Sequence, residues 1–200
     1  MTTLAQTIAA PRRATAGSRT TFAAIAVVGG SMLMAGLAQL SIHLAFTPVP
    51  ITGQTLGMLL VGASLGPGLG ALSMALYLVE GGLGLPFFAG GTHGWSLLQL
   101  SSASGGFLWG FVIGGAVVGA LARLGWDRSV RSSISAMFAG EVVLYAIGVP
   151  WLMSALHVGI QDGLSYGLYP FVVGDTIKLL AAAGLLPAAW KLVRRGQGSR

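Results

Sequence analysis

Long apolar stretches fill most of the chain, and polar residues interrupt them only briefly. Between residues 20 and 79, His43 is the only acidic or basic residue. A membrane-spanning helix needs about 20 apolar residues, so this stretch holds more than one helix. Pro48, Pro50 and Pro67 mark the breaks, because proline lacks the backbone N–H that a helix requires. The pattern therefore predicts helices over residues 20–46, 51–65 and 69–85, the second of them short.

The second half of the chain repeats this alternation. Apolar runs predict helices over residues 107–124, 132–156 and 168–192. The segment 81–106 is rich in glycine, serine and aromatic residues, which predicts a long, partly helical loop. Shorter loops are expected at 125–131 and 157–166. The sequence thus predicts an all-α membrane protein with a six-helix transmembrane domain over residues 20–192, between basic tails at 1–19 and 193–200.

Composition and charge agree with a membrane location and orient the chain. Hydrophobic residues make up 54% and charged residues only 8%, whereas soluble domains carry about 25% charged residues. With six spans, both tails and the loops at 66–68 and 125–131 share one side, which the positive-inside rule makes cytoplasmic. The opposite side then has no lysine or arginine. The basic residues expected on the cytoplasmic side are Arg12, Arg13, Arg19, Arg123, Arg128, Arg131, Lys191, Arg194, Arg195 and Arg200.

This distribution also limits the possible partners. Basic residues in short clusters between apolar runs are an orientation signal, so a nucleic-acid partner is not expected despite the net charge of +6. The absence of cysteine excludes disulfides and thiol chemistry. We expect a multi-pass protein of the bacterial inner membrane, in contact with the lipid bilayer.

Charged residues inside the predicted spans are candidates for function, because each costs several kcal/mol at the bilayer centre. Asp175 and Lys178 share a helix face at a spacing of three residues. Glu141 is expected at a similar depth, and Tyr145 lies on its face. Two interpretations remain open: an internal ion pair that stabilises packing, or a pocket on the outer side with an acceptor for N–H groups and a cation for a carboxylate. Glu80 is expected near the outer end of its helix.

A short motif around Ser64 suggests a different activity. Residues 62–66 read GASLG and match the G-x-S-x-G pattern of hydrolases, but that pattern needs a strand–turn–helix context. His43, His93 and His157 are all expected on the opposite side, so an intramembrane serine hydrolase is a distant alternative. No phosphate-binding loop or metal motif is present in the sequence. Uphill transport would therefore draw on an ion gradient or a separate ATPase.

Several segments together resemble the BioY biotin transporter family. They are FTPVPIT at 46–52, QTLG at 54–57, LGP at 65–67, LGALS at 69–73, GLP at 84–86, FAGG at 88–91, GGF at 105–107, GVPW at 148–151, PF at 170–171, and GD at 174–175 with lysine at 178. The resemblance spans roughly residues 20–190. It implies the six-helix S-component of an energy-coupling-factor (ECF) transporter, which captures biotin from the outer side and is not an enzyme. The implied partners are a transmembrane T-component and ABC-type ATPase subunits, and no cofactor is implied.

The resemblance also implies a binding site beneath two loops: the loop between the first and second predicted helices, and the loop between the third and fourth. Asp175 is expected to accept a ureido N–H of biotin, and Lys178 to donate to the ureido carbonyl or to the carboxylate. The further candidates for substrate binding are Gly90, Gly91, Phe88, Thr92, Trp95, Tyr145, Trp151 and Glu141. The family often has G-P-T-G-G before helix 4, whereas this chain has SASGG at 102–106, so the resemblance implies no particular contact at 102–104.

Two other transport functions fit the same residues. One is a stand-alone secondary transporter of biotin or a related small carboxylate, in which coupling through Glu141 would make uptake depend on pH. The other is a passive channel, which the buried charges and the lid-like loop disfavour.

Overall fold

The computed structural model describes residues 2–9 and 15–198; Arg12, Arg13 and Arg200 of the predicted tails lie outside these residues. The helices and strands run in the order α1 (Leu4–Ala9), α2 (Ala16–Ala38), β1 (Ser41–Ile42), β2 (Ile51–Thr52), α3 (Gln54–Gly82), α4 (Gly105–Arg123), α5 (Val130–Leu156), α6 (Ile160–Gly167) and α7 (Tyr169–Gly198). Two short 3-10 turns, η1 (Ala89–Gly91) and η2 (Trp95–Leu98), lie between α3 and α4.

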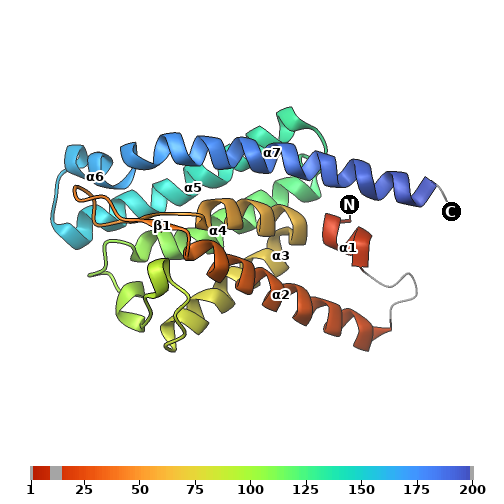
Figure 1. Ribbon diagram of the computed structural model, residues 1–200, viewed down its shortest axis with the longest axis horizontal. Helices are drawn as coiled ribbons and strands as arrows, with labels where there is room; N and C mark the ends of the chain where they lie inside the picture. Colours follow the sequence, from red (N-terminus) through yellow and green to blue (C-terminus); the bar gives the residue numbers. More distant parts are fainter. Residues whose placement is uncertain (1, 10–14, 199–200) are drawn as a thin grey trace.

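The long helices form a bundle along the long axis of the molecule (Figure 1). Within the described residues, α2, α3, α4, α5 and α7 are long and apolar enough to cross a membrane. Their outward side chains are apolar too: Ile25, Val173 and Leu192 are each more than two-thirds exposed. Lipid tolerates such a surface, and helices satisfy their own backbone hydrogen bonds within it. The chain is therefore an all-α, multi-pass membrane protein, as predicted.

α3 folds back on itself at Gly66. The backbone there has φ 83° and ψ 178°, a conformation that favours glycine, and Pro67 follows. The Gln54 amide donates a hydrogen bond to the Tyr77 hydroxyl at 2.6 Å across 23 residues; a straight helix would separate these residues by about 35 Å. Residues 54–65 and 67–82 are thus two helices side by side. The break predicted at 66–68 is confirmed, and the number of membrane crossings stays a prediction.

Glycines let the central helices approach closely. A Cβ at Gly62 of α3 would lie 2.5 Å from the carbonyl oxygen of Gly115 in α4. A Cβ at Gly119 would lie 2.5 Å from the carbonyl carbon of Gly66. Close backbone contact is a main source of packing energy between helices in lipid. The abundance of glycine in the apolar runs therefore reflects tight packing of α3 against α4.

Several predicted boundaries differ from the structure. Residues 1–19, predicted as a tail, contain α1 and the start of α2, and Leu4 is buried against the bundle. The first long helix ends at Ala38 instead of residue 46, because the chain turns into the β1–β2 hairpin that pairs Ser41 with Thr52. Helix α6 occupies most of the predicted loop 157–166, and α7 continues through Pro187 to Gly198.

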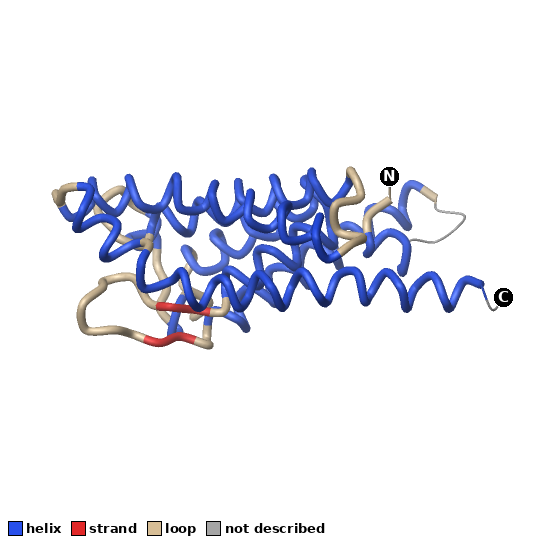
Figure 2. Tube along the Cα trace, turned by 90° about the horizontal axis from the view of Figure 1, so that it is seen from above, coloured by secondary structure: helices blue, strands red, loops and turns tan. Residues whose placement is uncertain are grey.

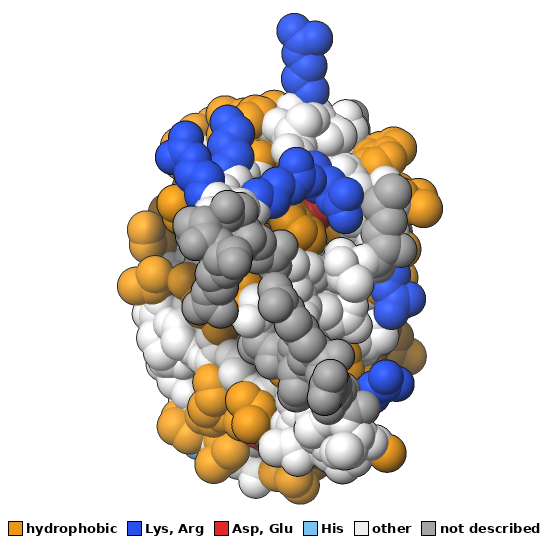
Figure 3. All heavy atoms as spheres, turned by 90° about the vertical axis from the view of Figure 1, so that its right-hand side faces the viewer, with side chains coloured by type: hydrophobic (Ala, Val, Ile, Leu, Met, Phe, Trp, Pro, Cys, Tyr) orange, Lys and Arg blue, Asp and Glu red, His pale blue; other side chains and the backbone are white. Residues whose placement is uncertain are grey.

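The two ends of the bundle differ in character. The β1–β2 loop and α6 lie at one end, on the left of Figure 1, and both chain termini lie at the other. From above, the two short strands lie beside the helices at the same end (Figure 2). The opposite end carries blue lysine and arginine side chains (Figure 3). Loops and strands therefore gather at one end, and positive charge gathers at the other.

Candidate functional site

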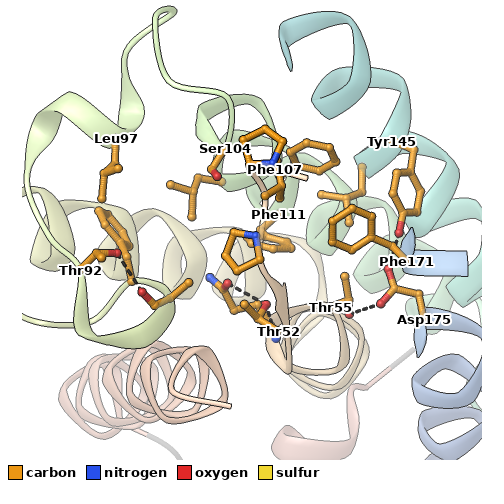
Figure 4. Close-up of a pocket in the computed structure, with 18 of the residues that line it drawn as sticks. Thr52, Thr55, Thr92, Leu97, Ser104, Phe107, Phe111, Tyr145, Phe171 and Asp175 are labelled. Atoms are coloured by element: carbon orange, nitrogen blue, oxygen red, sulfur yellow. Dashed lines mark hydrogen bonds between the residues drawn. The ribbon is translucent and has the colours of Figure 1, made fainter. Parts of the chain in front are cut away.

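A cavity of about 200 Å³ lies at the loop end of the bundle. The β1–β2 loop, the loop between α3 and α4, and helices α4, α5 and α7 surround it (Figure 4). Polar side chains gather at one side of the cavity around Asp175, and aromatic rings form much of the wall. The lining residues are His43, Pro48, Val49, Pro50, Thr52, Gln54, Thr55, Phe88, Ala89, Thr92, Leu97, Ser104, Phe107, Leu108, Phe111, Leu144, Tyr145, Phe171, Asp175 and Lys178.

Asp175 is the centre of a buried hydrogen-bond cluster. Its side chain is only 2% exposed. One carboxylate oxygen, Oδ1, accepts from the Thr55 hydroxyl at 2.8 Å and from the Lys178 ammonium at 2.8 Å. The other oxygen, Oδ2, accepts from the Tyr145 hydroxyl. Side chains from α3, α5 and α7 thus converge on one carboxylate.

Lys178 uses every donor it has within this cluster. Besides Asp175, its ammonium donates to the Thr52 carbonyl at 2.5 Å and to the Thr55 hydroxyl at 3.1 Å. An ammonium group has three N–H donors, so these three bonds saturate it. These bonds tie α7 to the start of α3.

A second polar chain runs from the cavity into the bundle. The Thr52 hydroxyl donates to Gln54 Oε1 at 2.8 Å, and the Gln54 amide donates to the Tyr77 hydroxyl. Gln54 is 4% exposed, so these bonds satisfy polar groups that would otherwise be costly to bury. They also fix the first turn of α3, which presents Thr55 to Asp175.

Aromatic rings from four segments form the apolar wall. The ring centroid of Phe107 in α4 lies 6.3 Å from that of Phe171 in α7 and 6.2 Å from that of Tyr145 in α5. Phe88 is 2% exposed and packs edge-on against Tyr77 at 5.5 Å. Such rings favour the apolar body of a ligand, which the few polar groups of the cavity would orient.

The loop between α2 and α3 covers the cavity and is tied down at both sides. The Thr47 hydroxyl donates to the Tyr166 carbonyl of α6 at 2.6 Å. On the other side, the Gln39 amide donates to the carbonyls of Ala35 at 3.0 Å and Pro86 at 3.2 Å. We call residues 39–53 the lid; it spans the cavity from α2 to α6.

Five of the predicted binding residues line the cavity: Asp175, Lys178, Phe88, Thr92 and Tyr145. Figure 4 shows Thr92 and Asp175 at opposite sides of it, with Phe107 and Phe111 between them.

The other five predicted residues lie around the cavity without lining it. Gly90 and Gly91 form a turn with φ 62° and 80°, and a Cβ at Gly90 would meet His43 of the lid at 3.5 Å. Trp95 is 48% exposed and covers Gly82. Their predicted contact with a ligand has no support in the geometry of the cavity.

Trp151 and Glu141 lie on α5 behind the wall. The Trp151 indole packs on Gly106 and donates to the Ser102 carbonyl at 3.2 Å, which supports the start of α4. Glu141 is 8% exposed, and its Oε1 has no hydrogen-bond partner among the described residues. Ser104 lines the cavity, at a position for which the resemblance implied no particular contact.

Most of the polar lining residues have no separate signal in the sequence. Thr52, Thr55 and Gln54 are uncharged, so the cost of charge in a membrane does not single them out. Their position in the FTPVPIT and QTLG segments was the available clue. His43 reaches the cavity only because the lid folds back over it.

Comparison with known proteins assigns the chain to a family. The family model for BioY matches residues 9–195. The chain belongs to the BioY family. A biotin transporter of Thermotoga maritima is 37% identical over 162 residues, which cover 81% of this chain and 87% of the relative. A biotin transporter of Rhizobium etli is 36% identical, over 71% of this chain and 78% of the relative.

A solved structure shares the fold of this BioY-family protein. It is the crystal structure of an S-component for biotin from an ECF-type ABC transporter. The TM-score is 0.78 at 24% identity, and the match covers 89% of this chain and 95% of that one.

The named relatives are transporters, which confirms the prediction that this BioY-family chain is not an enzyme. Ser64, the candidate nucleophile, lines a separate groove whose other lining residues are apolar or glycine.

Proposed function

We propose that this protein captures biotin in the cavity beneath the lid, as the substrate-binding component of a biotin uptake system. The observation that carries the proposal is the buried cluster of Asp175, Lys178, Thr55 and Tyr145 at one side of an aromatic cavity. Buried ionisable groups inside a membrane protein mark ligand sites by default. Relatives that cover most of the chain are named biotin transporters.

The cluster suits the ureido ring of biotin better than its carboxylate. The ureido group is neutral and carries two N–H donors beside one carbonyl. Asp175 offers an acceptor and Lys178 a donor 2.8 Å apart, which matches that pattern with charge-assisted bonds. Either ligand group would have to replace one of the three present partners of Lys178. A carboxylate would also add a second buried negative charge beside Asp175, whereas the neutral ureido carbonyl would not. Of the two expectations for Lys178, donation to the ureido carbonyl is therefore favoured.

The carboxylate then belongs at the far side of the cavity. His43, Thr92 and Ser104 line that part, under the lid and at the start of α4. Their hydroxyl and imidazole groups can donate hydrogen bonds to a carboxylate. The apolar body of biotin would lie between the two poles against Phe88, Phe107 and the other rings.

The finer topology belongs to the same proposal: six crossings, with both termini in the cytoplasm of a bacterial cell. The fold-back of α3 at Gly66 supports two crossings there. Residues 54–65 form a helix about 18 Å long, whereas the hydrocarbon core of a bilayer is about 30 Å thick. Such a short helix is tolerated when neighbouring helices bury it. The basic residues at the end opposite to the cavity support a cytoplasmic location for that end.

We propose in addition that a T-component and ABC-type ATPases energise uptake. The structural relative, whose fold this chain shares, comes from an ECF-type ABC transporter. The sequence here holds no phosphate-binding loop of its own.

Biotin binding by the purified protein in detergent tests the proposal. Asp175→Asn keeps the shape of the side chain and removes the charge that holds Lys178 and the ureido N–H. Loss of a hydrogen bond to a charged group should weaken binding by about 10- to 100-fold. Asp162→Asn, the same change at an exposed position of α6, is the matched control and should bind like the parent. A folded parent that does not bind biotin would contradict the proposal.

A further inference from the structure

The end opposite to the cavity carries a second set of organised charges. Arg128 and Arg131 lie in and just after the α4–α5 turn, and Lys191, Arg194 and Arg195 lie in the last part of α7. We call these five residues the basic patch. Lys191, Arg194 and Arg195 are spaced by three and four residues, so they share one face of α7. Figure 3 looks onto this end and shows lysine and arginine side chains beside apolar ones.

Trp190 fixes the α4–α5 turn against α7. Its indole donates to Asp127 Oδ2 at 2.5 Å, and the Arg128 guanidinium lies 4.9 Å above its ring. Asp127 and Trp190 are 2% and 5% exposed. These contacts hold Arg128 next to the basic face of α7, and Arg194 is close enough to act electrostatically on Asp127. The position of Arg128 in the patch is therefore fixed by buried contacts with Asp127 and Trp190.

Apolar side chains surround the patch where the spanning helices end. Leu124, Val130 and Leu192 are 66%, 51% and 69% exposed, and Trp126 is 39% exposed. Tryptophan is enriched where membrane and water meet. Exposed apolar groups beside cationic groups at this depth match a phospholipid, which presents a headgroup phosphate next to acyl chains.

The charge balance favours an anionic headgroup. Among the residues that the structure describes at this end, Asp127 is the only acidic one. The other four acidic residues of the chain lie in α3, α5, α6 and α7. Arg128 is positioned by stacking, and a planar guanidinium can bind phosphate oxygens in a two-pronged manner.

We propose that the basic patch is a binding site for an anionic phospholipid, with the phosphate held by Arg128 and the basic face of α7 and the acyl chains against the apolar rim. The general orientation signal of a membrane protein needs only positive charge on one side. The anchor of Asp127, Arg128 and Trp190 goes beyond that requirement, since it holds the Arg128 guanidinium over Trp190, next to the basic face of α7.

Native mass spectrometry of the purified protein tests the site, with phosphatidylglycerol titrated against phosphatidylcholine in the same detergent. We expect phosphatidylglycerol to bind preferentially and the preference to fall as salt rises. Each cation near an anionic lipid contributes about fivefold in affinity, so Arg194→Gln should weaken phosphatidylglycerol binding by about that factor. Arg19→Gln removes the same charge at the start of α2, outside the patch, and should leave binding within about twofold of the parent.

Three outcomes would overturn the proposal. Equal binding of the two lipids would remove the role of headgroup charge. Equal losses in Arg194→Gln and Arg19→Gln would indicate diffuse attraction without a site. If millimolar inorganic phosphate competes as effectively as phosphatidylglycerol does, the patch is an anion site that does not recognise a lipid. All variants are at exposed positions, so folding is not at risk.

Discussion

Three buried carboxylates meet three different environments in this chain, and the differences show what each one does. Asp175 has both oxygens in hydrogen bonds and a lysine beside it. Glu141 has an oxygen without a partner among the described residues. Asp127, outside the spans, accepts one hydrogen bond from Trp190 and leaves Oδ1 buried without a partner. Only Asp175 combines full satisfaction with a position on the cavity, which is what a preformed ligand site requires.

The environment of Asp127 leads to a prediction for stability. Burial raises the pKa of Asp127, and the Trp190 hydrogen bond and nearby arginines only partly oppose this. The folded protein thus binds this proton more tightly than the unfolded chain, so stability falls as pH rises from the ordinary value of about 3.9 to the raised pKa. Asp127→Asn keeps an oxygen for Trp190 and removes the buried charge. We expect a higher Tm than the parent at pH 7.5 and no difference below about pH 4.

Thermal unfolding in detergent across this pH range checks the prediction, with Asp162→Asn as the control that should follow the parent. A lower Tm of Asp127→Asn at pH 7.5 would mean that attraction to Arg128 and Arg194 outweighs the cost of burial.

Single residues also show where the sequence was informative. Asp175 and Lys178 could be predicted because charge inside a membrane is costly and a spacing of three places them together. Thr52 and Thr55, which hold that pair, could not, since threonine is common in membrane helices and its partners depend on the fold. Trp151 shows the converse: a residue inferred from resemblance supports α4 from behind the wall.

At the scale of elements, the breaks were easier to predict than the ends. Gly66 followed by Pro67 stops a helix for local reasons, and the break lies where the sequence predicts it. The end of α2 at Ala38 depends on the lid. In the lid, Ile42 of β1 pairs with Ile51 of β2, and Thr47 between them bonds to the distant Tyr166 carbonyl. Pairing of this kind leaves no periodic pattern in two-residue strands.

The lid gives a prediction at this scale. The Thr47 hydroxyl connects the lid to α6 by donating to the Tyr166 carbonyl. The same hydroxyl accepts a hydrogen bond from the Val49 N–H at 3.2 Å. Thr47→Val keeps the volume and removes both bonds. A net loss of about 1 kcal/mol would loosen the closed lid. If the cavity binds biotin, its dissociation should become about fivefold faster.

Biotin dissociation in a chase experiment measures this effect. Thr176→Val is the matched control, because the Thr176 hydroxyl is exposed and bonds only to its own helix at the Val172 carbonyl. Dissociation from Thr47→Val at the rate of the parent would show that the lid opens without breaking the contact to α6.

At the scale of the whole molecule, the two ends of the bundle are chemically separate. The cavity, the lid and α6 occupy one end, where Lys178 is paired with Asp175, and the basic patch occupies the other. The sequence predicts this separation of the basic residues to one end, because hydropathy locates the spans and their order assigns each basic cluster to one side. The depth and shape of the cavity were beyond reach, since they follow from how six apolar helical segments pack and not from their boundaries.

The fold-back of α3 turns this polarity into a test of the number of crossings. The chain has no cysteine, so single cysteines can be introduced at exposed positions without background: Arg19→Cys before α2, His93→Cys after α3, and Arg195→Cys near the end of α7. If α3 crosses twice, three crossings separate residue 19 from residue 93, and the two lie on opposite sides. If α3 crosses once, they lie on the same side. A membrane-impermeant maleimide added to intact cells should therefore label His93→Cys alone, and the other two only after permeabilisation; labelling of Arg19→Cys and His93→Cys from the same side would contradict the six-crossing topology.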